Sequence, residues 1–251
     1  MKHNVRHLEQ ELQWLGTLLV KRAGEGKPGK GTEFRLTSAP VLRSPASVYQ
    51  HFIKSFELDD AERAILILAL QPHIAPGFLE AKLIEAGVDP ARLAELGCVK
   101  TTHYSGMLPT GETALFLLAG RQMEQRIMYT LYFTPAHKFY SKNILRLSDA
   151  PSEEPETSGI LTISKEILYM LTSGTQWRPH FNTQFPARQV TTSYTWEDLV
   201  LNDETLLQMD EIRDWLAYRL KLLNDWGFSK HTTGGYKCLF YGPPGTGKSL
   251  A

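Results

Sequence analysis

Hydrophobic residues recur at helical spacing in the first segment of the chain, residues 1–22. Intervals of three and four residues separate Val5, Leu8, Leu12, Leu15 and Leu19. This spacing is typical of an amphipathic helix. The repeat covers little more than two heptads, and a coiled coil usually needs about three or four. The pattern therefore favours packing onto the chain's own domain over a zipper with another chain.

Residues 23–44 break this pattern with glycines and prolines, among them Gly24, Gly26, Pro28 and Pro40. Clusters of these residues are typical of a linker or an irregular loop, which we expect here. Basic residues gather between Lys21 and Lys30. They indicate a solvated linker, and the alternative is a contact with phosphate or with an acidic partner.

Residues 45–149 return to helical periodicity and predict a domain. Asp59 is placed to cap a helix through residues 61–70, which Pro72 is expected to end. We expect the side chains buried in this helix to include Ile65, Leu66, Leu68 and Ala69.

The same domain is expected to hold further helices and one hairpin. The helices are predicted at 78–86, between Pro76 and Gly87, at 91–96, at 111–118 with Thr110 as cap, and at 121–133 with Met123, Ile127, Met128 and Leu131 on one side. Residues 98–108 indicate a short hairpin. Three helices followed by a hairpin suggest a winged-helix-like domain, an analogy of fold that does not specify function.

Beyond this domain the pattern changes several times. Residues 150–158 lack large apolar side chains and predict an acidic, proline-containing linker. Residues 159–195 form a connecting segment, with β-prone residues at 159–163 and a short helix capped by Ser164. A long helix is expected at 204–226, ended by Gly227. Lys237 to Tyr241 then predict a buried strand.

A phosphate-binding motif follows that strand directly. Residues 242–249 read Gly-Pro-Pro-Gly-Thr-Gly-Lys-Ser, which satisfies the P-loop pattern G-x-x-x-x-G-K-[ST]. Glycines let the backbone curl so that its N–H groups surround a triphosphate. Lys248 is expected to reach the β- and γ-phosphates of ATP, and Ser249 is expected to bind Mg²⁺. The predicted nucleotide site consists of Gly242, Pro243, Pro244, Gly245, Thr246, Gly247, Lys248, Ser249 and Leu250.

Residues 235–251 resemble the start of an AAA+ ATPase module, in which the Gly-Pro-Pro-Gly-Thr-Gly-Lys loop is typical. Trp196-Glu-Asp-Leu-Val200 is similar to the family's segment that packs near adenine. The resemblance implies that residues 196–251 are the beginning of the module. The implied fold is mainly α with small β elements: a helical, winged-helix-like domain followed by the first helix, strand and P-loop of an incomplete α/β AAA+ module.

The order of segments is similar to AAA+ ATPases associated with bacterial phage-tail-like contractile injection systems. That resemblance implies a ring of subunits that remodels a protein complex, with ATP and Mg²⁺ as cofactors and an unidentified protein substrate. In this family the acidic motif, the sensor and the arginine finger follow the P-loop. We therefore expect the chain to be an N-terminal portion that does not hydrolyse ATP alone. The alternative is a non-enzymatic adaptor with an inert loop.

The composition of the chain excludes several other classes of protein. Lys+Arg and Asp+Glu are both 27, which argues against nucleic acid as the main partner. A winged-helix DNA binder is the least favoured alternative. No apolar run is long enough to span a bilayer, so we expect a cytoplasmic protein with no membrane partner. The two cysteines, Cys98 and Cys238, predict no disulfide framework, and the histidines form no zinc-binding pattern.

Overall fold

A computed structural model describes residues 2–24, 35–43, 45–88, 93–177, 192–198, 200–227 and 235–244. The chain divides into two compact units. Unit 1 is Met1–Pro179, and unit 2 is His180–Ala251. The molecule is mainly helical, with one small antiparallel sheet among the described residues, as the sequence predicts.

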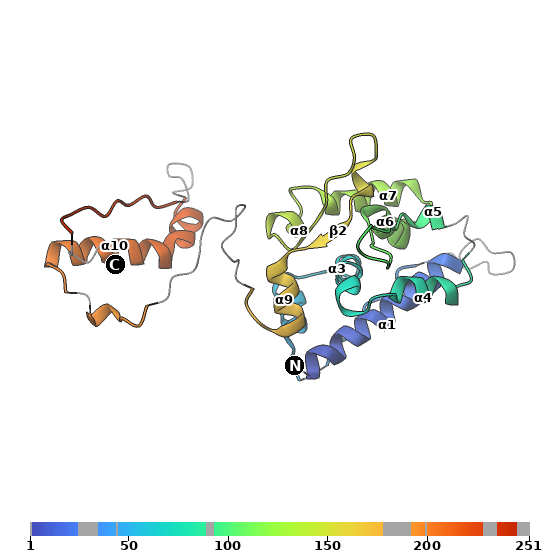
Figure 1. Cartoon of the computed structure of the whole chain (residues 1–251), viewed down its shortest axis with the longest axis horizontal. Helices are drawn as coiled ribbons and strands as arrows, with labels where there is room; N and C mark the ends of the chain where they lie inside the picture. Colours follow the sequence, from blue (N-terminus) through green and yellow to red (C-terminus); the bar gives the residue numbers. More distant parts are fainter. Residues whose placement is uncertain are drawn as a thin grey trace. The chain divides into compact units, whose positions relative to one another are not determined.

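Unit 1 holds most of the described elements (Figure 1). Its α-helices are α1 (Lys2–Gly24), α2 (Val48–Ser55), α3 (Asp60–Ile74), α4 (Phe78–Glu85), α5 (Leu93–Leu96), α6 (Gly111–Ala119), α7 (Met123–Thr130), α8 (Lys138–Ser141) and α9 (Lys165–Ser173). Its 3₁₀ turns are η2 (Leu131–Phe133) and η3 (Glu156–Ser158). Its strands are β1 (Leu145–Leu147) and β2 (Leu161–Ile163).

The centre of unit 1 is α3, which is buried on all sides. Residues 64–70 are each at most 1% exposed. A helix that is apolar all round belongs in a domain interior, and α3 contacts α1, α6 and β2 (Figure 1). The predicted burial of Ile65, Leu66, Leu68 and Ala69 is confirmed.

The start of α3 follows the prediction, and its end does not. Asp59 Oδ1 accepts a hydrogen bond from the Glu62 N–H, and Glu62 Oε2 accepts one from the Asp59 N–H. This reciprocal capping box fixes the first turn. The helix continues to Ile74, so the prediction that Pro72 ends it is wrong. Pro72 lies in the last turn, where its missing N–H costs one intrahelical bond and its φ still suits a helix.

The first helix packs along unit 1 with its apolar side inward. Leu15, Leu18 and Leu19 are at most 1% exposed, and α1 contacts α2, α3 and α4 (Figure 1). The prediction that this helix packs onto its own domain is confirmed. Of the predicted stripe, Val5 is 44% exposed and therefore lies outside the buried side of the helix.

Polar side chains fasten both ends of α1 to distant parts of unit 1. Asn4 Nδ2 donates to the Leu171 carbonyl at the end of α9, at 2.5 Å. The Arg22 guanidinium donates to the carbonyls of Leu117 and Leu118 at 3.0 and 2.7 Å. These bonds satisfy carbonyls near the C-terminal ends of α9 and α6, which lack intrahelical partners.

The two strands of unit 1 form an antiparallel pair in which Arg146 lies opposite Thr162. Each strand turns its first and third side chains inward and its middle side chain to solvent. The β-prone segment at 159–163 therefore contains a strand, whereas no pattern in the sequence predicts β1. Residues 150–158, predicted as a linker, connect the two strands within unit 1.

Residues 98–108, predicted as a short hairpin, form a loop closed by one antiparallel bridge between Val99 and Leu108. The Val99 N–H donates to the Leu108 carbonyl at 3.0 Å, and the Leu108 N–H donates to the Val99 carbonyl at 2.8 Å. The predicted cap of the following helix is also present, because Thr110 Oγ1 accepts a hydrogen bond from the Thr113 N–H. This hydroxyl also donates to the Gly97 carbonyl at 2.7 Å, which ties α6 to the end of α5.

One side of α7 and η2 is apolar and faces solvent. Met123, Ile127, Met128 and Leu131 are 75%, 65%, 58% and 61% exposed. The sequence correctly places these four residues on one side of a helix. We call them the α7 face.

Fewer helices and turns are described in unit 2 than in unit 1. Unit 2 contains the 3₁₀ turn η4 (Trp196–Asp198), α10 (Asp203–Leu220) and a π-helical turn, η5 (Lys221–Asp225). Asn202 caps α10 by accepting from the Thr205 N–H at 2.8 Å. The predicted long helix is thus present, with a π-helical final turn before Gly227, whose φ is +74°.

The predicted apolar side of α10 is mostly uncovered. Within the described part of unit 2, Met209 is the only buried hydrophobic residue, at 6% exposed. Leu216 and Leu220 are 65% and 66% exposed. In the structure this helix therefore has little packing to stabilise it.

Candidate functional site

The predicted P-loop is described only at its first residues. Gly242, Pro243 and Pro244 lie in the described range 235–244. Gly242 has a φ of 152°, which favours glycine over residues with a side chain. Gly245, Thr246, Gly247, Lys248, Ser249 and Leu250 lie outside the described residues.

The segment before the loop differs from its prediction. Residues 237–241 form no strand. Leu239 is 84% exposed and Tyr241 is 88% exposed, so the prediction of a buried strand is wrong for this structure. A buried strand needs neighbouring strands for its backbone N–H and C=O groups, and the described part of unit 2 contains none.

The turn at η4 holds the residues that the family resemblance places near adenine. Asp198 Oδ2 accepts hydrogen bonds from the Thr195 N–H and hydroxyl at 2.7 and 3.0 Å. These bonds lower the pKa of the Asp198 carboxyl. The Arg213 guanidinium lies 5.2 Å from the centre of the Trp196 ring, which is cation–π distance. The bonds to Asp198 close the turn itself, and the Arg213–Trp196 contact joins the turn to α10.

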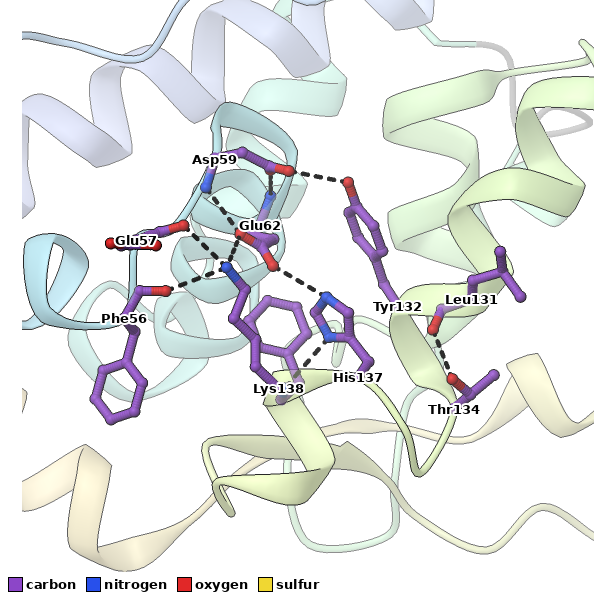
Figure 2. A network of polar contacts seen from close by, with 10 residues as sticks. Phe56, Glu57, Asp59, Glu62, Leu131, Tyr132, Thr134, His137 and Lys138 are labelled. Carbon is purple, nitrogen blue, oxygen red and sulfur yellow. Dashed lines mark hydrogen bonds and ion pairs between the residues drawn. The ribbon is translucent and has the colours of Figure 1, made fainter. Parts of the chain in front are cut away.

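Unit 1 contains a polar network that sequence reasoning missed (Figure 2). Figure 2 shows the side chains of His137 and Lys138 pointing toward the Glu62 carboxylate, which also accepts from the Asp59 N–H. Glu62 Oε1 lies 3.0 Å from His137 Nε2, and Glu62 Oε2 lies 2.8 Å from Lys138 Nζ. The Glu62 side chain is only 3% exposed. A buried carboxylate is costly unless it is paired and hydrogen-bonded, and here it is both.

The contacts of His137 define its tautomer. The Phe139 N–H donates to His137 Nδ1 at 3.2 Å, which caps α8. Nδ1 therefore carries no proton, and Nε2–H donates to Glu62. Burial disfavours the charged ring and lowers its pKa, while Glu62 acts in the opposite direction. Protonation of Nδ1 would remove the acceptor that caps the helix.

The other members of the network are also fully engaged. Tyr132 donates its hydroxyl to Asp59 Oδ2 at 3.0 Å, and its ring stacks on His137 at 4.8 Å. Burial, followed by the charge of Asp59, raises the pKa of Tyr132. Lys138 Nζ also donates to the carbonyls of Phe56 and Glu57 at 3.1 and 2.9 Å.

The Glu62 network therefore joins α3 to the segment from η2 to α8. The side chains of Asp59, Glu62, Tyr132, His137 and Lys138 are each engaged by hydrogen bonds or ion pairs within the protein (Figure 2). We interpret the Glu62 network as a structural network rather than a catalytic site. The Asp59-x-x-Glu62 spacing is a sequence signal for the capping box, but no pattern marks His137 or Lys138 as its partners.

A second buried ion pair lies between α1 and α3. Glu11 pairs with Arg63, whose guanidinium also donates to the Pro40 carbonyl at 2.9 Å. Burial raises the pKa of Glu11, and Arg63 opposes this effect. The pair fixes how the two helices meet, and its burial leaves no access for a substrate.

Candidate chemistry elsewhere in the described residues is limited. Burial raises the pKa of Cys98 to about 11, so its thiol is protonated and unreactive near neutral pH. Over the described ranges, no group of three or more His, Cys, Asp or Glu side chains is arranged to hold a metal ion. The predicted Mg²⁺ ligand, Ser249, is not among those residues.

Within the described ranges, no single helix has both the length and the apolar composition to cross a membrane. The helices α3 and α4 reach the required length and apolar composition only when they are counted as one span, and a bend of 113° separates them.

The P-loop motif and the η4 turn are thus the features on which the predicted nucleotide site rests, whereas the Glu62 network is structural. Comparison with protein-family models, curated proteins and solved structures finds no match to the chain.

Proposed function

We propose that this chain belongs to a cytoplasmic AAA+ ATPase that binds Mg·ATP and uses its hydrolysis to remodel a protein complex. The observation that carries the proposal is the Gly-Pro-Pro-Gly-Thr-Gly-Lys-Ser sequence at 242–249. Each residue type in this motif matches a need of a bound triphosphate. Lys248 supplies charge, Ser249 supplies an oxygen ligand for Mg²⁺, and the glycines bring backbone N–H groups close.

Unit 1 would hold the partner-binding part of this enzyme. The order of α3, α4, α5 and the loop closed by the Val99–Leu108 bridge supports a winged-helix-like arrangement. The near balance of charge favours protein over nucleic acid as its partner. A ring of subunits would then carry several copies of unit 1.

Binding of a fluorescent ATP analogue to the purified chain tests the proposal. We expect Lys248→Ala to weaken binding in the presence of Mg²⁺ by at least about tenfold, or 1.4 kcal/mol, because it removes the charge beside the phosphates. Lys237→Ala is the matched control, since this lysine precedes the motif. No Mg²⁺-dependent binding, or equal binding by the two variants, would contradict the proposal.

The exposed α7 face favours a second candidate, a non-enzymatic adaptor. Four large apolar side chains in solvent on one helix are typical of a surface that another protein covers. An adaptor would bind its partner equally well with Lys248→Ala, and ATP would not affect the complex. The first candidate instead requires partner release to depend on ATP.

A further inference from the structure

Unit 2 contains a hollow lined by aromatic rings between α10 and the segment that begins at Tyr236. It has a volume of about 430 Å³. Its rings come from Trp215, Tyr218, Trp226 and Tyr236. Trp215 and Tyr236 lie with their centres 6.0 Å apart and their planes tilted by 47°. The two rings are therefore tilted against each other rather than stacked face to face.

Three charged side chains also line this aromatic hollow. Glu211 and Asp214 contribute carboxylates, and Lys221 contributes an ammonium. Neither carboxylate has an ion-pair partner in the described residues, whereas Asp210, on the same helix, pairs with Arg213 at 2.7 Å. The hollow therefore combines electron-rich ring faces with a net negative charge.

We propose that this aromatic hollow binds an organic cation, with an alkylammonium or guanidinium head between the rings. Aromatic faces attract cations through the ring quadrupole, and cages of several rings are a common means of binding quaternary ammonium groups. The two carboxylates add a Coulomb attraction that a neutral ligand of the same shape lacks. The Arg213–Trp196 contact in the same unit is an internal example of this interaction.

The site is separate from the proposed nucleotide site. Tyr236 precedes the predicted strand at 237–241, and the P-loop follows it. Among the described residues that line the hollow, none belongs to the predicted nucleotide site at 242–250. All of them precede Gly242 in the chain.

The test is a titration of the whole chain with choline, without nucleotide, followed by NMR of the choline methyl protons. We expect saturable binding with an upfield ring-current shift. The neutral isostere 3,3-dimethyl-1-butanol should bind at least about tenfold more weakly, because it has the shape without the charge. A parallel titration uses N-acetylarginine amide, which stands for an arginine side chain of a partner protein. Tighter binding of this compound than of choline would identify a protein side chain, rather than a small amine, as the source of the bound cation.

Two matched pairs of variants assign the binding to this hollow. Tyr236→Leu should weaken choline binding about two- to fivefold, whereas Tyr194→Leu, which alters a tyrosine outside the hollow, should not. Asp214→Asn should weaken it by a similar factor, about two- to fivefold, whereas Asp210→Asn should not. Circular dichroism checks that α10 remains helical in each variant.

Equal affinity for choline and its neutral isostere would overturn the proposal, as would the absence of saturation by either cation. Choline binding that survives both Tyr236→Leu and Asp214→Asn would also overturn it. None of these outcomes depends on Lys248, so a failure of the proposed ATP site is distinguished by the separate nucleotide titration.

Discussion

Glu62 lies at the centre of the polar network that joins α3 to α8. Its carboxylate accepts from the Asp59 N–H and pairs with His137 and Lys138 (Figure 2). Removing one partner from a buried charged network leaves the others without compensation, which is more costly than the network itself is stabilising.

We therefore expect Glu62→Ala to lower the free energy of unfolding by about 2–4 kcal/mol. Urea denaturation of the purified chain measures this. The control is Glu124→Ala on α7, which alters an exposed carboxylate and should change stability by less than about 0.5 kcal/mol. Similar losses for the two variants would mean that the Glu62 network contributes nothing specific.

His137 makes stability depend on pH. Its folded pKa lies below the 6.5 of the unfolded chain because burial disfavours the charged ring. As pH falls through 6.5, the unfolded chain takes up a proton that the folded protein resists. Stability from this group is therefore fully present above pH 6.5 and declines below it. Burial also lowers the pKa of His73, which acts in the same direction.

His137→Asn tests this assignment, since asparagine can cap α8 but does not titrate. Urea denaturation at pH 7.5 and 5.5 should show a smaller loss of stability in the variant than in the unmodified chain. The comparison of the two proteins is needed because Glu11, whose pKa is raised, acts in the opposite sense. An unchanged pH dependence would assign the effect to other groups.

At the scale of elements, the β1–β2 pair depends on the close approach of Gly159 to the chain before it. A Cβ at Gly159 would lie 2.2 Å from the Ser148 carbonyl oxygen and 3.2 Å from that of Glu156. Both are backbone atoms, so they cannot move aside without distorting the strand pair. Only glycine fits at this turn into β2.

Gly159→Ala should therefore destabilise unit 1 by about 1–3 kcal/mol, as overpacking in an interior does. Gly24→Ala is the control, because a Cβ at Gly24 would meet nothing within 4 Å. Thermal unfolding followed by circular dichroism would show the difference. Equal melting temperatures would indicate that the chain around Ser148 rearranges freely.

The sequence predicts elements well where one helix carries its own signals. Asp59 and Thr110 cap their helices as expected, since capping depends on residues three positions apart. Prediction of an element from the sequence fails where the element forms only by pairing with residues distant in the chain. β1 is defined by its pairing with β2 across the predicted linker at 150–158, which local pattern does not reveal.

The same contrast between local and distant partners explains which candidate sites can be predicted from the sequence. The P-loop is a local motif, so sequence alone identifies it. The Glu62 network joins residues more than 70 positions apart, such as Tyr132 and Asp59, which bond across a separation of 73. The aromatic hollow in unit 2 likewise brings Tyr236 to the side of α10, which no periodicity predicts.

At the scale of the whole molecule, the two units differ in how much of their structure is buried. Residues 64–70 of α3 are enclosed, whereas α10 has Met209 as its one buried hydrophobic side chain among the described residues. An isolated helix of this length is marginal in water. The stabilities of the two units should therefore differ widely.

Hydrogen exchange followed by mass spectrometry should show this contrast. We expect amides of α3 to exchange at least about 100-fold more slowly than those of α10, because exchange in α10 requires only local opening. Peptides from α1 provide the control within unit 1. Equal protection of α10 would mean that another surface, such as a second copy of the chain, covers its exposed side.

The bonds at the two ends of α1 have a consequence for how the protein is made. Asn4 donates to the carbonyl of Leu171, and Arg22 donates to those of Leu117 and Leu118. Neither side chain can form these bonds until the later residue has been synthesised. During synthesis α1 meets α2, α3 and α4 early, whereas Leu117, Leu118 and Leu171 emerge much later. The two ends of α1 are therefore the last parts of this helix to be fixed, because contacts between residues distant in sequence form slowly.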